Sequence, residues 1–299
     1  MAGRMHHDEI DSDVDLVRRL LREQHPQWAD QAIERVTSTG TANALFRLGT
    51  ELVARLPLRP SETGPAGKER RWLPVLAPHL PLAVPVPIAL GKPTDAFPWP
   101  WAVYPWLPGD DAITATLDLR QAAVDLAAFV LALRAIDAID GPRPSAANYG
   151  RGVPLALRDD YTRRAIEASA GLTDTAAVLA AWESDLAAPP WTGPPVWVHG
   201  DLAAGNLLVR NGRLSGVVDW GALGVGDPAC DLVVAWELFE GDSRELFRSE
   251  LAVDDATWAR GRGWALSTAI VALPYYWETN PFMADQARRK IAAVLSDHS

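Results

Sequence analysis

One stretch of the chain decides how the rest is interpreted: residues 196–221 read VWVHGDLAAGNLLVRNGRLSGVVDWG. Three short aliphatic or β-branched runs lie in it, each bounded by Gly, Asn or Asp as brief strands are. The runs span residues 196–198, 206–209 and 214–218. Asn211 and Gly212 separate the second run from the third and favour a two-residue hairpin turn. The pattern predicts a strand, a loop and a β-hairpin.

Polar residues stand at the ends of these predicted strands. The hairpin folds Asn206 and Asp219 back toward one another, and Asp201 lies on the loop that enters it. Phosphoryl transfer needs a carboxylate near the attacking hydroxyl. It also needs oxygen ligands for Mg²⁺, which takes few protein ligands and keeps the substrate phosphates. Asp201 fits the first role, and Asn206 and Asp219 fit the second as metal ligands.

These residues also carry a resemblance to a known family. The pattern HGDxxxxN at residues 199–206, followed by DWG at 219–221, resembles the catalytic loop and metal motif of aminoglycoside phosphotransferases. The protein-kinase template has HRDxxxxN and DFG. Gly200 in place of Arg and Trp220 in place of Phe match the antibiotic-kinase version of both motifs.

The resemblance implies an α+β fold with two lobes, similar to that of protein kinases. A small, β-rich N-lobe over residues 1–105 is expected to bind the nucleotide, and a larger, mainly helical C-lobe over 106–299 to carry catalysis and substrate binding. Asp201 is the expected catalytic residue, and ATP or GTP with Mg²⁺ are the expected cofactors. His199 and Asp231 are expected to brace the catalytic loop rather than act as base or nucleophile.

The resemblance also places residues around the nucleotide in the first lobe. Ser38 and Thr39 lie in a small-residue loop of the kind that covers phosphates. Arg55 stands where the kinase pattern has a strand lysine, and we expect it to clamp the phosphates, although a surface arginine on an edge strand is the alternative. Glu69 is the expected partner of Arg55, ahead of Glu62.

The segment that leaves the first lobe resembles the family's interlobe hinge, whose backbone groups read the purine edge. Pro105 has no N–H to donate, so we expect Tyr104 or Trp106 to provide the donor. Aromatic side chains at such positions also serve as ordinary core.

Hydrophobic periodicity predicts the remaining elements. Ser12 or Asp13 can cap the helix expected over 13–24, and Thr173 or Asp174 the helix expected over 173–186. The expected strands are 33–36, 44–48, 51–56, 81–90 and 101–106; the expected helices are 13–24, 68–76, 117–139, 157–170, 173–186, 230–239, 243–251, 255–273 and 281–295. The prolines of 81–87 argue for an edge strand.

Composition sets further limits. The 299 residues are 48% hydrophobic and 22% charged, which is typical of a soluble globular protein with one large or two linked domains. The single cysteine, Cys230, excludes an intrachain disulfide framework and favours a reducing compartment, so we expect a cytoplasmic protein. Residues 1–15 lack the apolar core of a secretory signal, and no run has the length of a membrane span. We expect no membrane partner.

The net charge of −10 lies in the second part of the chain. Residues 1–105 carry 12 basic and 12 acidic side chains, so residues 106–299 carry the other 16 basic and 26 acidic ones. Nucleic acid is a poor partner for such a surface. An acidic cleft concentrates cations, which favours a small cationic hydroxylated substrate, although acidic surfaces also serve solubility alone.

The acceptor is therefore expected to be an aminoglycoside or a similar cationic antibiotic. Glu237, Glu240 and Glu278 are the candidate substrate-binding residues, with ordinary helix packing as the alternative. Other acceptors remain open: a choline-like amine, a methylthio-sugar, a macrolide or a cyclic-peptide antibiotic. A pseudokinase that binds nucleotide without catalysis is a further reading, which only the arginine at position 55 supports.

Overall fold

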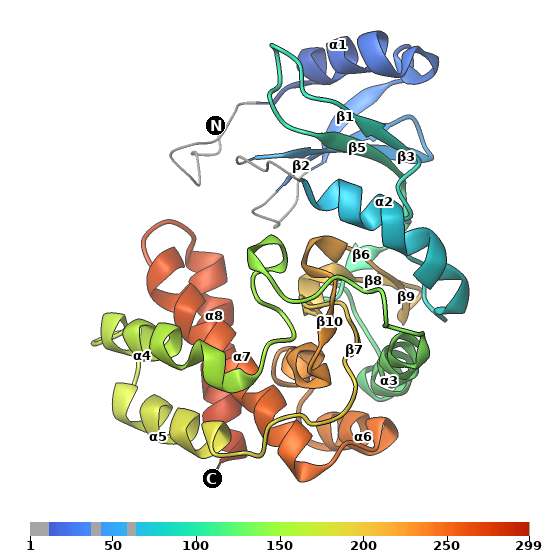
Figure 1. The fold of residues 1–299 in the computed structure, drawn as a ribbon. Helices are drawn as coiled ribbons and strands as arrows, with labels where there is room; N and C mark the ends of the chain where they lie inside the picture. Colours follow the sequence, from blue (N-terminus) through green and yellow to red (C-terminus); the bar gives the residue numbers. More distant parts are fainter. Residues whose placement is uncertain (1–11, 37–42, 59–63, 299) are drawn as a thin grey trace. The chain divides into compact units, whose positions relative to one another are not determined.

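The computed structural model describes residues 12–36, 43–58 and 64–298. The chain divides into two units, one of residues 1–109 with 215–221 and one of 110–214 with 222–299 (Figure 1). The sequence predicts a boundary at residue 105, whereas the structure has it at residue 109. Residues 215–221, which begin within the second strand of the predicted hairpin, also belong to the first unit.

The first unit is built on a five-stranded antiparallel sheet with the order β1-β2-β3-β5-β4. Its strands are β1 (Ile33–Val36), β2 (Asn43–Leu48), β3 (Leu52–Pro57), β4 (Ala89–Gly91) and β5 (Trp101–Pro105). Side chains of β2 alternate between half-buried and buried, the period of a strand with one face on a core. That core joins Phe46, Leu56 and Val103 of the sheet to Leu20 and Leu21 of α1.

Two helices accompany this sheet in the first unit. Helix α1 (Val14–Gln24) begins one residue after its predicted start, because Asp13 is the cap and its carboxylate accepts the Leu16 N–H at 2.7 Å. Helix α2 (Gly64–Leu76) starts earlier than predicted and retains Pro74 within its last turn.

The predicted strand over residues 81–90 is wrong for most of its length. Only Ala89–Gly91 forms a strand, β4, while Ala83 makes an isolated parallel bridge to Gly216. The cause is local chemistry: prolines at 81, 85 and 87 remove ladder donors from the segment.

The second unit is mainly helical (Figure 1). Its helices are α3 (Leu119–Ala135), α4 (Asp159–Ala168), α5 (Thr175–Leu186), α6 (Gly241–Leu251), α7 (Asp255–Tyr276) and α8 (Pro281–Asp297). Asp174 caps α5 by accepting two backbone N–H groups, as one of two predicted caps. None of the helices in the described ranges has the length and apolar character that a membrane span requires.

Residues 196–221 contain three short strands. Strand β7 (Val196–Val198) pairs with β10 (Gly224–Gly226). The hairpin of β8 (Leu207–Arg210) and β9 (Arg213–Val217) is joined by β6 (Asp110–Asp111) to give the order β6-β8-β9. Asn211 and Gly212 at the turn both have positive φ, 54° and 76°, as a tight hairpin requires.

The helix predicted over residues 230–239 is instead a 3₁₀ segment, η7 (Pro228–Trp236). All of its residues are buried. A segment that is apolar on every side has no amphipathic period, so its sequence cannot distinguish one helix type from another.

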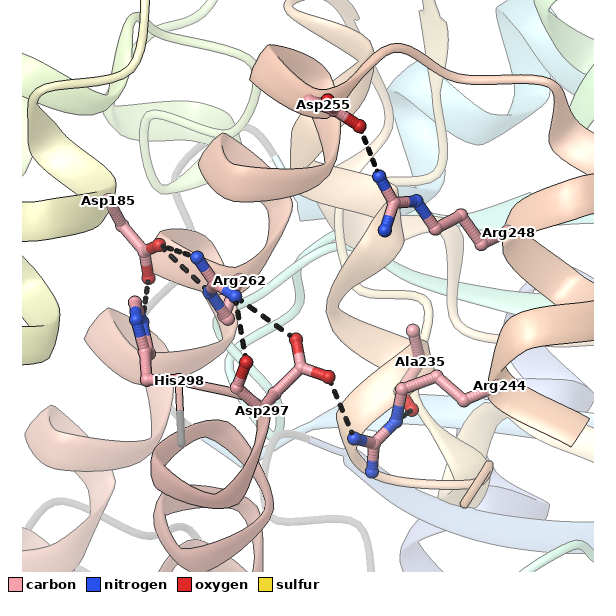
Figure 2. Close-up of polar contacts among 8 residues, drawn as sticks. All are labelled: Asp185, Ala235, Arg244, Arg248, Asp255, Arg262, Asp297 and His298. Carbon is pink, nitrogen blue, oxygen red and sulfur yellow. Dashed lines mark hydrogen bonds and ion pairs between the residues drawn. The ribbon is translucent and has the colours of Figure 1, made fainter. Parts of the chain in front are cut away.

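A partly buried charge network connects the last helix to its neighbours in the second unit (Figure 2). Arg262 of α7 contacts Asp185 of α5 at 2.8 Å and Asp297 of α8 at 3.2 Å. Arg244 of α6 contacts the other oxygen of Asp297 at 3.4 Å, and His298 lies 3.2 Å from Asp185. Burial raises the pKa of Asp185, and Arg262 and His298 oppose that rise. The C-terminal end of α8 is thus held by three other helices.

Candidate active site

The loop that carries the HGD motif is held by one buried carboxylate. Asp231 Oδ2 accepts the His199 N–H at 2.8 Å, and Oδ1 accepts the Gly200 N–H at 2.7 Å. Burial raises the pKa of Asp231, while His199 and the two N–H donors work against the rise. Asp231 is 1% exposed and therefore lies where a supporting residue is expected, behind the loop rather than at its surface.

Asp201 is the exposed member of this loop. Its backbone N–H donates to His199 Nδ1 at 3.2 Å, so the imidazole contacts the backbone of the same loop. Asn206 Nδ2 donates to the Asp201 main-chain oxygen at 2.8 Å and to Oδ2 at 3.3 Å. The Asp201 side chain is 47% exposed, so its orientation is fixed while its carboxylate stays open to a substrate.

A residue that the sequence analysis missed also contacts this carboxylate. Arg151 Nη2 lies 3.4 Å from Asp201 Oδ1, from a loop far away in sequence. Gly200 makes room for it: a Cβ there would lie 3.0 Å from Arg151 Cβ and 2.4 Å from the Ala222 oxygen, and its φ is +83°. Position 200, where protein kinases have an arginine, therefore has no room for a side chain. Arg151 instead places a guanidinium next to Asp201.

Arg151 belongs to a small cationic cluster over one aromatic ring. Its guanidinium lies 5.8 Å from the Trp264 ring centre, and that of Arg158 lies 4.4 Å from the same ring. Burial, and then the charge of Arg151, lower the pKa of Arg158 to about 10. Arg151 Nε is buried and has no hydrogen-bond acceptor among the residues that the structure describes.

In the first unit, the structure pairs Arg55 with Glu69 as the sequence predicts. The Arg55 Nη2 to Glu69 Oε1 distance is 2.7 Å, and the Tyr104 hydroxyl donates to the other oxygen of Glu69. Arg55 Nη1 lies 3.9 Å from Asp219 Oδ1. Burial alone would lower the pKa of Arg55, but Glu69, Tyr104 and Asp219 hold it above its ordinary value.

The DWG motif is fixed within the same unit. Asp219 adopts φ +59°, the left-handed region, and its side chain is 41% exposed. Trp220 is buried and its indole N–H donates to the Val217 oxygen at 3.0 Å. Lys68 Nζ donates to the Gly221 oxygen at 2.7 Å, a contact between residues far apart in sequence that no local pattern predicts. Burial lowers the pKa of Lys68 to about 8, against the opposing charge of Glu69.

The predicted hinge donor at Trp106 is wrong. The Trp106 N–H donates to the Glu51 oxygen at 2.7 Å, because the chain continues the β3–β5 ladder past the end of β5. The Arg47 guanidinium carbon lies 4.6 Å from the centre of the Trp106 ring, and the Tyr104 hydroxyl donates to Glu69. Neighbouring residues of a strand point their backbone groups to opposite edges, so the Pro105 carbonyl faces away from β3.

The candidate substrate residues are placed differently from one another. Glu237 lines a pocket of about 340 Å³ but is bonded to Lys290 and to the Ala204 N–H. Glu240 caps α6, where Ser243 takes part in a capping box. Glu278 is exposed beyond the end of α7. Only the first of the three lines this pocket.

Ser38, Thr39 and Glu62 lie outside the described residues. Within the described ranges there is no group of three His, Cys, Asp or Glu side chains that could hold a metal ion. A magnesium nucleotide needs no such group, because the phosphates supply most ligands. Asn206 Nδ2 donates a hydrogen bond to Asp201, which leaves Oδ1 as the atom that could bind a metal ion. Asp219 offers a partly exposed carboxylate. These oxygen donors fit Mg²⁺.

A family model described as the phosphotransferase enzyme family matches residues 33–264. The chain belongs to this family. An aminoglycoside 3'-phosphotransferase from Escherichia coli is 34% identical over 77 residues, which are 25% of this chain and 28% of that protein. The match thus spans little more than a quarter of the relative.

Solved structures share the fold of this phosphotransferase family member over nearly the whole chain. A GDP and kanamycin complex of APH(2")-IIIa has a TM-score of 0.72 at 19% identity, covering 95% of this chain and 99% of that one. The macrolide 2'-phosphotransferase of Brachybacterium faecium has a TM-score of 0.63 at 24% identity, covering 94% and 97%. The expected kinase-like α+β fold is confirmed.

Proposed function

We propose that this member of the phosphotransferase enzyme family transfers the γ-phosphoryl group of ATP or GTP to a hydroxyl of a small molecule. Solved structures of the same fold hold GDP or ADP, which supports the nucleotide. Solved structures of this fold also hold kanamycin, gentamicin or streptomycin. The acidic second part of this chain supports an aminoglycoside as the first acceptor to test.

One observation carries the proposal: Asp201 is half-exposed, although the loop on which it lies is held in place by several contacts. Asp231 holds the loop backbone, and Asn206 and Arg151 each take one carboxylate oxygen of Asp201. The Asp201 carboxylate nevertheless remains 47% exposed, as a group that meets a substrate must.

The role assigned to Asp201 is to orient the acceptor. The acceptor hydroxyl donates a hydrogen bond to the carboxylate, which accepts the proton late in the transfer. Such positioning and charge stabilisation account for most of the acceleration in phosphoryl transfer.

Arg55 is assigned to the nucleotide phosphates. The carboxylate of Glu69, 1% exposed, fixes its guanidinium at 2.7 Å. Asn206 Oδ1 and the Asp219 carboxylate are the assigned Mg²⁺ ligands, and bound Mg²⁺ would neutralise charge on the phosphates. The Pro105 carbonyl is the assigned contact to the purine edge.

Two alternatives remain. A macrolide-like acceptor is the first alternative, because a macrolide phosphotransferase shares the fold and apolar side chains are among the residues that line the pocket beside the catalytic loop. A pseudokinase is disfavoured because Arg55 forms the ion pair that a catalytic lysine would form.

The test is nucleotide consumption by the purified protein with Mg²⁺, across aminoglycosides, macrolides and an acceptor-free blank, with both ATP and GTP. The proposal expects consumption that depends on an acceptor, together with an acceptor mass increased by one phosphate. Consumption equal to the blank for every acceptor would overturn it.

A further inference from the structure

A pocket within the second unit lies beside the loop that carries Asp201. Its volume is about 340 Å³, and Ala204 of that loop forms part of its wall. Its lining combines polar groups with the apolar side chains of Ile113, Leu117, Trp236 and Leu238. Its charged lining residues are Glu237, Arg289 and Lys290. This is an unusual lining for a site expected to attract a polycation.

The one carboxylate of the pocket is fully engaged. Lys290 Nζ lies 2.5 Å from Glu237 Oε2, and the Ala204 N–H donates to Oε1 at 2.8 Å. The two side chains are 12% and 13% exposed, so little solvent screens the pair. Charge-assisted hydrogen bonds of this kind are the strong ones, and they strengthen where water is excluded.

Lys290 is presented by a helix that is fixed along its length. Ala287 and Ile291, its neighbours on the inner face of α8, are buried. Beyond them, Asp297 anchors the end of α8 to Arg262 and Arg244 (Figure 2). The lysine is therefore held at the pocket by the fold and does not depend on a mobile terminus.

We propose that Lys290 fills, from within the chain, the position on Glu237 that the ammonium group of an acceptor would otherwise take. The pocket then selects a hydroxylated acceptor that is uncharged where it meets Glu237. This rests on the proposed function and narrows its acceptor class. A cationic acceptor would have to displace Lys290 and leave a mostly buried ammonium without its partner, which is costly.

Arg289 adds to the same preference. It also lines the pocket, and its guanidinium pairs at 2.7 Å with Asp285 on the exposed side of α8. No lining residue of this pocket, all of which lie in the described ranges, supplies a carboxylate that lacks a cation.

The experiment removes the internal cation. Lys290→Met keeps the length of the stem and deletes the charge, and Lys290→Gln is a second variant that leaves Glu237 a hydrogen-bond donor. Arg288→Met is the control, because Arg288 is an exposed neighbour on α8 that does not line the pocket. The probes are kanamycin and kanamycin acetylated at every amine, so they differ in charge.

Binding is measured by titration calorimetry without nucleotide, and turnover by nucleotide consumption. In either Lys290 variant, kanamycin should bind about tenfold more tightly or better relative to its acetylated form, the gain of one charge-assisted contact. Arg288→Met should keep the wild-type ratio. An unchanged ratio in Lys290 variants that fold, shown by their thermal unfolding, would overturn the proposal.

The two hypotheses fail separately. If no acceptor supports nucleotide consumption, the proposed function fails, while calorimetry still reports the charge preference of the pocket. If turnover occurs but the Lys290 variants keep the wild-type ratio, only the charge preference fails.

Discussion

Arg55 Nη2 lies 2.7 Å from Glu69 Oε1, and Glu69 receives the Tyr104 hydroxyl on its other oxygen. Arg55 is therefore not a surface arginine on an edge strand: its side chain is 11% exposed, and β3 lies between β2 and β5. Arginine provides a planar guanidinium that can engage a carboxylate and a phosphate together, which a single ammonium does less well.

Replacing Arg55 by Ala should destabilise the protein and weaken nucleotide binding. It leaves the buried Glu69 without its cation, a change that costs about 3–5 kcal/mol when a buried pair loses one member. Arg55→Lys keeps the charge and should retain most stability. Denaturant unfolding and the KM for nucleotide check both effects. Equal stability of the alanine variant and wild type would contradict the importance of the pair.

Replacing Arg151 by Ala should lower kcat about tenfold or more with a smaller change in acceptor KM, because positioned groups act mainly on the transition state. Added guanidinium ion should restore part of the rate. Arg143→Ala, which removes an exposed arginine from the preceding segment, is the matched control. An Arg151→Ala enzyme with wild-type kcat would show that its contact with Asp201 has no role in turnover.

Replacing Asp219 by Asn should raise the Mg²⁺ concentration needed for half-maximal rate by about tenfold or more, because a neutral amide is a poorer ligand for a hard cation. Steady-state rates over a Mg²⁺ titration check this. Asp242→Asn, on the first turn of α6, serves as the control. If the Mg²⁺ requirement of Asp219→Asn equals that of wild type, this carboxylate is not a ligand.

The lowered pKa of Lys68 predicts that the free energy of unfolding depends on pH. Its pKa is about 8 in the folded protein against an ordinary 10.5, so between these values the unfolded chain binds more protons than the folded one. Stability contributed by this group therefore rises with pH across that window, is complete above 10.5 and is lost as pH falls through 8. Lys68→Met should remove that slope in denaturant unfolding measured at several pH values. An identical slope in wild type and variant would be inconsistent with the shifted pKa.

The sequence predicted what short-range chemistry determines. The hairpin followed from Asn211 and Gly212, and the start of α1 from the capping of Asp13, because turns and caps are decided by a few neighbouring residues. The 199–206 and 219–221 motifs were recognisable since their chemistry fixes both residue type and spacing. The strand prediction for 81–90 was wrong because the prolines of this segment remove backbone donors that a strand needs, whatever its apolar content.

Long-range partners left no such signal. Nothing near Asp201 in the sequence indicates Arg151, and nothing near Glu237 indicates Lys290, because each contact is created by tertiary folding. Glu237 was therefore assigned to a cationic acceptor, whereas the structure pairs it within the chain. The donor at Trp106 was misplaced for a similar reason, since only the strand register shows that Glu51 accepts it.

The role of Asp201 in phosphoryl transfer is tested most directly by single-turnover transfer of labelled γ-phosphate to an acceptor, measured for wild type and Asp201→Asn. We expect the transfer rate of the variant to be roughly 10³-fold lower, within the range for removal of a proton-accepting group, while its affinity for nucleotide equals that of wild type. Transfer at the wild-type rate by Asp201→Asn would contradict it.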